Sequence, residues 1–280
     1  MRSLQFEDFA RATLGGASNI SDKSPLSNSQ IERITIFLAS PASGPDGSTS
    51  YAEFLASKLK DFPPELSEGK DYIAFSGEDR NGNSNYDNAI DYIEEVKNKA
   101  GIIGNTPWGN YINDTEKTPG NHPEFAAMEK KLKAFMDGEG VTPWKNDHAG
   151  ALRDMMWNAG SPKFFENAIA TGKPLVAFVD GAPANRGFSN FELTTALDHP
   201  DVRINGYPVS AFGPDPLAFA RNSAAEYQQL ERAVAQQAKA NSGRIVEVTD
   251  IQRNSMCSTI SICPIPSSAE TISNRWTNWN

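Results

Sequence analysis

The chain of 280 residues has few of the side chains that ligate metals or cross-link small folds: it contains two cysteines and three histidines. Cys257 and Cys263 both lie in the C-terminal tail, so no disulfide framework supports the fold. They either close one small loop or, as we expect, remain free thiols. His122, His148 and His199 do not share the spacing of metal ligands. The sequence therefore predicts no metal site.

Positive charge is also scarce. Lysine and arginine number 26 against 35 aspartates and glutamates, which gives a formal net charge of -9. Neutralising phosphates along a nucleic acid requires a basic face, and none is visible, so we expect no nucleic-acid partner. A small anionic ligand stays compatible with this charge if a few cationic groups or helix N-termini lie nearby.

Long apolar runs are absent from the sequence as well. No segment approaches the length that crosses a bilayer, and the first residues are interrupted by acidic side chains where a secretory signal needs a continuous apolar core. We expect no membrane partner and a cytoplasmic location. The sequence contains nothing that sets the oligomeric state.

The chain nevertheless has the composition of an ordinary globular protein, with 39% hydrophobic residues, which is enough for a sizeable core. We predict an α/β fold with a helical N-terminal part, a smaller α/β part with a short, mainly parallel sheet, and a ligand cleft between them. The expected domains are a helical region at 1–70, a core of two subdomains at 71–250 and a tail at 251–280.

Hydrophobic periodicity and breakers place the individual elements. Helices are expected at 31–38 with Ser29 as N-cap, at 51–62, at 88–100 capped by Asn85 or Asp87, at 124–136, at 152–171 and at 216–240. Strands are expected at 71–77, 175–179 and 244–248, and an edge strand or loop at 203–209. Pro162 predicts a kink or a new helix with Ser161 as its cap.

An acidic, asparagine-rich loop follows the first expected strand, at residues 78–87. It superficially resembles a calcium loop, but the alternate ligands and the closing glutamate of an EF-hand are not at the required positions. Calcium binding is therefore the weaker interpretation of this loop.

The segment 157–197 carries the most suggestive side chains. Trp157 and Ser161 precede the apolar strand at 175–179, and Phe188 and Glu192 follow it. This order puts a ring, a hydroxyl and a carboxylate near the ends of one buried strand, where ligand sites in α/β proteins gather. The alternative is ordinary: a core ring, a helix cap and a surface carboxylate.

Aromatic residues beside Ser, Gly or Asn in turns and helix ends favour the functional interpretation: they are Phe75, Trp108, Trp144, Trp157 and Phe188. Such rings suit a flat ligand, above all a cationic one. A single carboxylate among them is insufficient for a two-carboxylate glycosidase. It is sufficient where the leaving group is already activated, as a pyridinium is.

In this arrangement the chain resembles the ADP-ribosyl cyclase and NAD glycohydrolase family. The family has a Trp followed after four residues by Ser and after three more by Phe, like Trp157, Ser161 and Phe164. An Ala, an apolar strand and a Phe four residues before the catalytic Glu are similar to Ala168, LVAFVDG, and Phe188 with Glu192.

Two further family elements have partial counterparts. A Pro-x-Trp element resembles Thr142-Pro143-Trp144 with the Pro shifted by one, and the family's Trp-Ser pair resembles Phe75 with Ser76. An Arg beside that pair is missing, and Arg80 or Arg186 is a possible replacement. The family disulfides are absent too. The resemblance covers about half of the chain.

The family's acidic stretch also differs. Gly104 and Asn113 stand where the family has a Glu and an Asp, and Asn105 lies beside the first of them. In the family that Glu influences the balance between cyclisation and hydrolysis, so both the ring contacts and the product ratio are open here.

The resemblance implies cleavage of the nicotinamide N-glycosidic bond of NAD, a nucleotide substrate, with no separate cofactor. Glu192 would be catalytic, and the substrate-binding residues would be Trp157, Ser161, Phe188, Phe75, Ser76, Trp108, Asn105 and Asn113. The alternatives are a glycosyl-transferring enzyme on another nucleotide, a non-catalytic nucleotide-binding protein, and a lysozyme-like muramidase, for which no second carboxylate is evident.

Overall fold

The computed structural model describes residues 10–11, 13–14, 26–95, 97–141, 147–184 and 187–240. The chain divides into two compact units, Met1–Gln229 and Leu230–Asn280. All elements discussed below belong to the first unit, apart from the end of the last helix. The expected domains at 1–70, 71–250 and 251–280 stay predictions.

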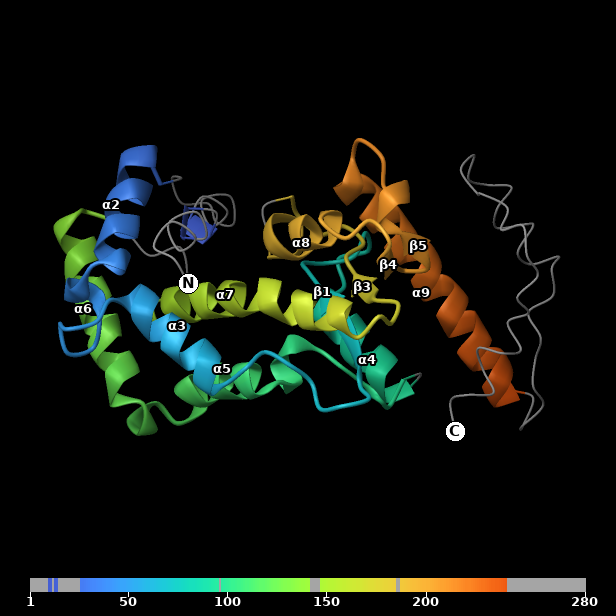
Figure 1. The fold of residues 1–280 in the computed structure, drawn as a ribbon, viewed down its shortest axis with the longest axis horizontal. Coiled ribbons are helices and arrows are strands. Elements are labelled where there is room, and N and C mark those ends of the chain that lie inside the picture. Colours follow the sequence, from blue (N-terminus) through green and yellow to red (C-terminus); the bar gives the residue numbers. More distant parts are fainter. Residues whose placement is uncertain are drawn as a thin grey trace. The chain divides into compact units, whose positions relative to one another are not determined.

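Helices account for most of the described elements (Figure 1). They are α2 (Asn28–Ala39), α3 (Tyr51–Asp61), α4 (Asn85–Glu95), α5 (Pro107–Lys117), α6 (Pro123–Gly138), α7 (His148–Ala170), α8 (Leu193–Leu197) and α9 (Pro216–Ala240). The strands are β1 (Asp71–Phe75), β2 (Ala100–Gly101), β3 (Val176–Phe178), β4 (Arg203–Ile204) and β5 (Tyr207–Pro208). The predicted α/β class with a small parallel sheet is confirmed. No helix of the described ranges is long and apolar enough to cross a bilayer.

Several predicted boundaries move because the local hydrogen bonds differ from the expected ones. Helix α2 is capped by Ser27, whose side chain accepts from the Gln30 N–H while the Gln30 side chain returns to the Ser27 backbone, so Ser29 is not the cap. Helix α4 begins at Asn85 rather than at residue 88 and ends at Glu95.

The prediction of a new helix at Pro162 is wrong. Helix α7 runs without interruption from His148 to Ala170 with Pro162 inside it. Ser161 is therefore not a helix cap, and its hydroxyl donates a hydrogen bond to a side chain outside the helix. The predicted segments at 244–248 and 251–280, including Cys257 and Cys263, lie outside the described residues.

The main sheet has the strand order β2-β1-β3, and both pairings are parallel. Alternate residues of β1 face opposite layers, as the two-residue period of a strand requires. Tyr72 lies against Phe164 of α7, whereas Ile73 belongs to a smaller cluster with Tyr92 of α4. Because helices cover both faces, β1 is almost continuously apolar.

The edge of β3 is closed by Asn205. The segment expected at 203–209 is a two-stranded antiparallel hairpin that turns at Asn205-Gly206, both with positive φ. The Asn205 side-chain oxygen accepts from the Ala177 N–H at 2.9 Å, and its amide donates to the Ala177 carbonyl at 3.1 Å. One side chain thus satisfies a backbone donor and acceptor that an open strand edge leaves unpaired.

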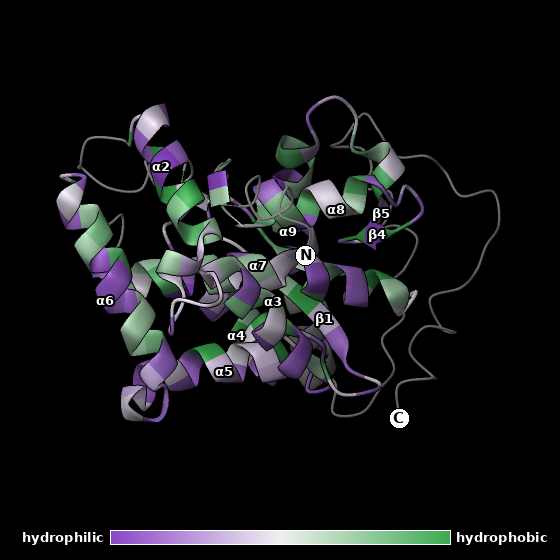
Figure 2. Ribbon diagram, turned by 60° about the vertical axis from the view of Figure 1, so that its left-hand side comes forward, coloured by the Kyte–Doolittle hydropathy of each residue, from purple (hydrophilic) through white to green (hydrophobic). Residues whose placement is uncertain are grey.

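Helix α7 is the element on which the other helices pack. It contacts α3, α5, α6 and α8 as well as β1, and it runs through the middle of the first unit (Figure 1). Hydrophilic and hydrophobic residues alternate along its neighbours α5 and α6 (Figure 2), as expected of helices with one buried face.

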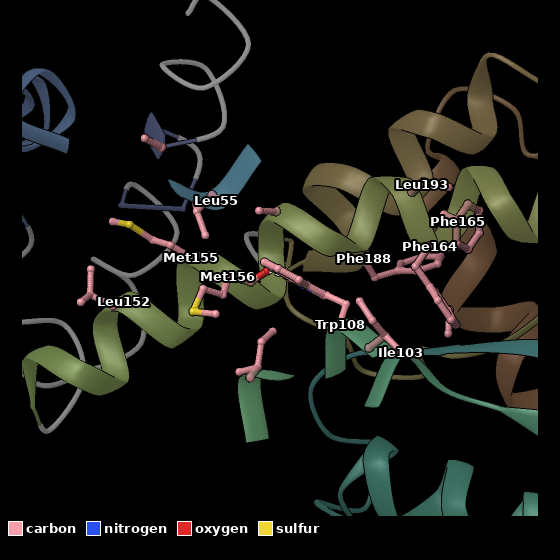
Figure 3. Packing of buried hydrophobic residues seen from close by; sticks show 14 of the residues in the cluster. Leu55, Ile103, Trp108, Leu152, Met155, Met156, Phe164, Phe165, Phe188 and Leu193 are labelled. Atoms are coloured by element: carbon pink, nitrogen blue, oxygen red, sulfur yellow. Dashed lines mark hydrogen bonds between the residues drawn. The ribbon is translucent and has the colours of Figure 1, made fainter. Parts of the chain in front are cut away.

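Trp108 makes a close contact between α5 and α7. Its ring is fully buried, and its indole N–H donates to the Met156 carbonyl at 3.0 Å (Figure 3). The ring lies directly against Gly160: a Cβ at that position would come within 2.2 Å of the Trp108 ring nitrogen. Only glycine fits at position 160. Its missing side chain lets the Trp108 ring, and with it α5, lie directly against α7.

We expect Gly160→Ala to destabilise the protein by about 1–3 kcal/mol, because the overpacking cost exceeds the ~1 kcal/mol that alanine contributes in a helix. Urea unfolding monitored by circular dichroism measures this change. Gly138→Ala is the matched control, since Gly138 also lies in a helix and has no neighbour within 4 Å of the added Cβ. Equal unfolding midpoints for both variants would contradict the packing argument.

Candidate functional site

A cavity of about 540 Å³ lies at the carboxyl ends of β1 and β2. Its walls are the end of β1 with the two residues that follow it, the turn at 102–105 after β2, one face of α7 and the turn at 187–192, together with Thr13, Tyr86 and Asn113. Ligand sites of open parallel sheets are found at this edge. The sequence placed the site around the strand at 175–179, but no residue of β3 lines the cavity. That expectation is corrected to β1.

Helix α7 supplies the longest wall. Asp154, Trp157, Asn158, Ser161 and Phe164 all line the cavity. Their spacing of three or four residues puts them on one face of the helix. The Trp-Ser-Phe spacing noted in the sequence is thus the spacing of a single helix face.

Glu192 is delivered by a π-helical turn, Phe188–Glu192, in which the Leu193 N–H donates to the Phe188 carbonyl five residues before it. Such turns are uncommon and are frequently found at functional sites. Phe188 and Glu192 are both buried and both line the cavity. The turn leads directly into α8, so Glu192 is held between the turn and this helix.

Glu192 is only 4% exposed. The Ser161 hydroxyl donates to Oε1 at 2.6 Å, whereas Oε2 has no hydrogen-bond partner among the residues that the structure describes. Burial raises the pKa of Glu192 to about 7, and the Ser161 hydrogen bond offsets part of that rise. A buried acceptor without a donor is costly to fold and is an atom that a ligand can satisfy.

Aromatic rings form much of the remaining surface. Phe75 at the end of β1 meets Tyr86 edge to face, with ring centroids 5.3 Å apart. Trp157 and Phe191 are partly exposed, and Phe188 lies deeper. Exposed rings of this kind offer stacking surfaces to a flat ligand.

Ser76 is held where the two central strands end. Its N–H donates to the Phe178 carbonyl, and its carbonyl accepts from the Asn85 side-chain amide at 2.7 Å. The same amide donates to the Asp180 carbonyl at 3.0 Å. Asn85 therefore ties the carboxyl ends of β1 and β3 together beside the cavity.

The structure brings eight of the nine predicted site residues to the cavity: Phe75, Ser76, Asn105, Asn113, Trp157, Ser161, Phe188 and Glu192. Gly104, which stands where the family has a Glu, lines it too. Trp108 does not, because its ring is fully buried in the core between α5 and α7. Trp108 is therefore corrected from a site residue to a packing residue.

Sequence reasoning missed a second carboxylate in the cavity. Asp154 lies three residues before Trp157 and seven before Ser161, on the same face of α7. The signal that could have found it is the helical spacing, because the helix expected from residue 152 puts Asp154 on the same face as Trp157 and Ser161. Asn158 and Asn190 were missed in the same way.

Two arginines, Arg80 and Arg186, were expected as replacements for the family's arginine near the site. Arg80 is paired with Asp180 at 2.5 Å and donates to the Asn222 side chain at 2.6 Å, and it does not line the cavity. Arg186 lies outside the described residues, as does the Thr142-Pro143-Trp144 element.

The acidic loop at 78–87 is closed by its own hydrogen bonds. The Asp79 carboxylate accepts from the backbone N–H groups of Asn81 and Asn83 and from the Asn83 side chain. Its acceptor atoms are thus occupied by the turn. Over the described ranges no group of three or more His, Cys, Asp and Glu side chains is arranged to hold a metal ion.

The raised pKa of Glu192 predicts a pH-dependent stability. Because the folded state favours the protonated group, the stabilisation is complete below the ordinary pKa of 4.5 and is lost as pH rises through about 7. We expect the free energy of unfolding to fall by an amount on the order of 3 kcal/mol over this window. Urea titrations between these pH values measure it.

The Glu192→Gln variant lacks the titrating group, so its stability should lose this component of the pH dependence. Glu166→Gln, an exposed change on the same helix as Ser161, is the control and should keep it. Identical pH profiles for wild type and Glu192→Gln would show that Glu192 ionises with its ordinary pKa.

Comparison with known proteins finds no match for this chain among protein-family models, curated proteins or solved structures. These comparisons neither support nor oppose the resemblance to the ADP-ribosyl cyclases. Function is therefore argued from the cavity and its residues.

Proposed function

We propose that the chain cleaves the nicotinamide N-glycosidic bond of NAD, with the cavity as its active site. The observation that carries the proposal is the Glu192 carboxyl group, which is buried, held at one oxygen by Ser161 and without a described partner at the other. The surrounding rings and the order of Trp157, Ser161, Phe188 and Glu192 along the chain add support.

The reaction needs no general acid from the protein, because the leaving group departs as a neutral molecule. The bond between C1′ of the ribose and the pyridinium nitrogen breaks, its electron pair stays on nitrogen, and nicotinamide leaves as a neutral molecule. Positive charge develops on C1′ and the ring oxygen of the ribose. Water then forms the new bond to C1′ and releases a proton, which yields ADP-ribose. An adenine nitrogen in place of water yields the cyclic product.

Glu192 would stabilise the developing oxocarbenium charge. A carboxylate can stabilise such a charge by several kcal/mol, and the effect is strongest where water is excluded. Glu192 is nearly inaccessible to solvent. A pyridinium bound beside it lowers the pKa of the carboxyl group, since an opposite charge favours ionisation. One carboxylate serves equally for an ion-pair or a covalent intermediate.

The other cavity residues would position the substrate. Trp157 and Phe75 present rings to the nicotinamide, Ser161 orients Glu192, and Ser76 with Phe188 borders the ribose and its phosphates. Asn105 and Asn113 offer amide groups to the carboxamide or to hydroxyls. With Gly104 and Asn113 in place of acidic residues, the product ratio is a property to be measured.

A second candidate function is favoured by Asp154. Two carboxylates in one cavity, one of them with a pKa of about 7, are the groups that an O-glycosidase uses as general acid and base. In that reaction Glu192 must be protonated, so activity would fall as pH rises above 7. In NAD cleavage Glu192 must be ionised, so activity would rise with pH.

We expect the purified protein to release nicotinamide from NAD. Chromatography of the products measures this release. Glu192→Gln should reduce kcat at least a hundredfold, because the amide cannot stabilise a cation as a carboxylate does. Glu166→Gln is the matched control and should retain full activity. Absence of release from the wild type would refute both the hydrolase and the cyclase activity, and NAD binding without release would favour a non-catalytic nucleotide-binding protein.

The pH dependence of kcat/KM supplies an independent prediction. For NAD cleavage the rate should rise with pH up to about 7, where Glu192 ionises in the free enzyme. Ser161→Ala removes a hydrogen bond that lowers the pKa of Glu192, so this limb should shift to higher pH. A falling limb near pH 7, with activity on an O-glycoside, would instead support the second candidate.

A further inference from the structure

Tyr86 is an exposed aromatic ring in the cavity lining. Over the described ranges the large apolar side chains with high exposure are Ile36, Leu197 and Tyr86, and of these only Tyr86 lines the cavity. Tyr86 is 47% exposed, whereas Glu192 is almost fully buried. The lining of the cavity therefore changes from a buried carboxyl group, where we propose that the bond breaks, to a ring that solvent reaches.

The start of α4 fixes Tyr86 beside the end of β1. The backbone N–H of Asn85 donates to the Gly77 carbonyl at 3.0 Å, and its side-chain amide donates to the Ser76 carbonyl at 2.7 Å. Asn85 is fully buried, so these bonds are shielded from water. The next residue, Tyr86, is thus carried on a backbone that is tied to two residues of the cavity lining, which preorganises its ring for a ligand.

Tyr86 and Phe75 present their ring faces in different directions. Their centroids lie 5.3 Å apart, and the angle between the ring planes is 70°. One flat group can stack on only one of these rings, because stacking needs nearly parallel planes. The cavity therefore offers two separate stacking surfaces. Such a pair suits a ligand with two flat groups joined by a linker, as the pyridinium and purine rings of a dinucleotide are.

We infer that the purine ring of the dinucleotide stacks on Tyr86, and that this residue sets a preference for the dinucleotide over the pyridinium mononucleotide. This inference rests on the proposed function, because it assigns the second half of the same substrate. The pyridinium ring must lie near Glu192, where its bond breaks. The purine is at the other end of the molecule and so reaches the exposed part of the lining, where Tyr86 determines specificity and takes no part in the bond cleavage.

Stacking sets the magnitude of the expected effect. Every purine has a flat π-face, and removal of the aromatic ring beneath a stacked base weakens binding by about 5- to 150-fold. The purine is remote from the reacting bond, so this interaction is equally strong before and during bond cleavage. Its loss therefore raises KM and leaves kcat unchanged.

Tyr86→Ala tests the assigned residue. It should raise KM for NAD by about fivefold or more with kcat unchanged, and should leave kcat/KM for nicotinamide mononucleotide, which lacks the purine, as in the wild type. Tyr86→Phe keeps the ring and should retain the wild-type KM. Leu197→Ala is the matched control, since Leu197 is an exposed residue of α8 outside the cavity lining. An unchanged KM for NAD in Tyr86→Ala, or an equal loss with the mononucleotide, would overturn the inference.

Failure of the inference is distinguishable from failure of the proposed function. ADP-ribose has the purine but no pyridinium, so its binding reports on Tyr86 whether or not the protein cleaves NAD. Calorimetry should show about fivefold or weaker binding of ADP-ribose to Tyr86→Ala and wild-type affinity in Tyr86→Phe and Leu197→Ala. If this pattern appears without nicotinamide release, the proposed function fails and the purine assignment stands. No binding of ADP-ribose to the wild type, or equal affinity in Tyr86→Ala, would refute the assignment.

Discussion

The hydrogen bond from Ser161 to Glu192 is the interaction on which the candidate site depends. It joins the middle of α7 to a π-helical turn 31 residues later in the chain, and it holds a carboxyl group where water scarcely reaches. Burying that group has a cost, which the raised pKa expresses. Buried groups with a shifted pKa cluster at functional sites, and Oε2, which has no partner among the described residues, is the atom that a ligand would contact.

The rest of the first unit keeps α7 where this bond can form. Trp108 packs on Gly160, one residue before Ser161, so α5 and α7 approach closely at that point. The parallel sheet lies between α7 and α4, and Asn85 joins the ends of its two central strands. The cavity therefore lies on the end of β1 and on α7 over much of its wall, whereas the turns at 102–105 and 187–192 supply other parts of it.

The sequence by itself determined the elements with strong local signals. The periodicity of residues 124–136 and 216–240 marked α6 and α9, the apolar runs marked β1 and β3, and the Trp157, Ser161 and Glu192 spacing pointed to residues that do line one cavity. These features follow from short-range hydrogen bonding and from the regular period of helices and strands.

Only the tertiary structure decided the remainder, because it depends on contacts between distant segments. Pro162 locally predicts a helix break, yet α7 continues through it as one helix packed on its neighbours. Trp108 reads as an exposed ring beside glycines, but Gly160, 52 residues away, accommodates it in the core. Asp154 reads as a solvated helix residue, and only the approach of β1 and the turn at 187–192 encloses it in the cavity with Glu192.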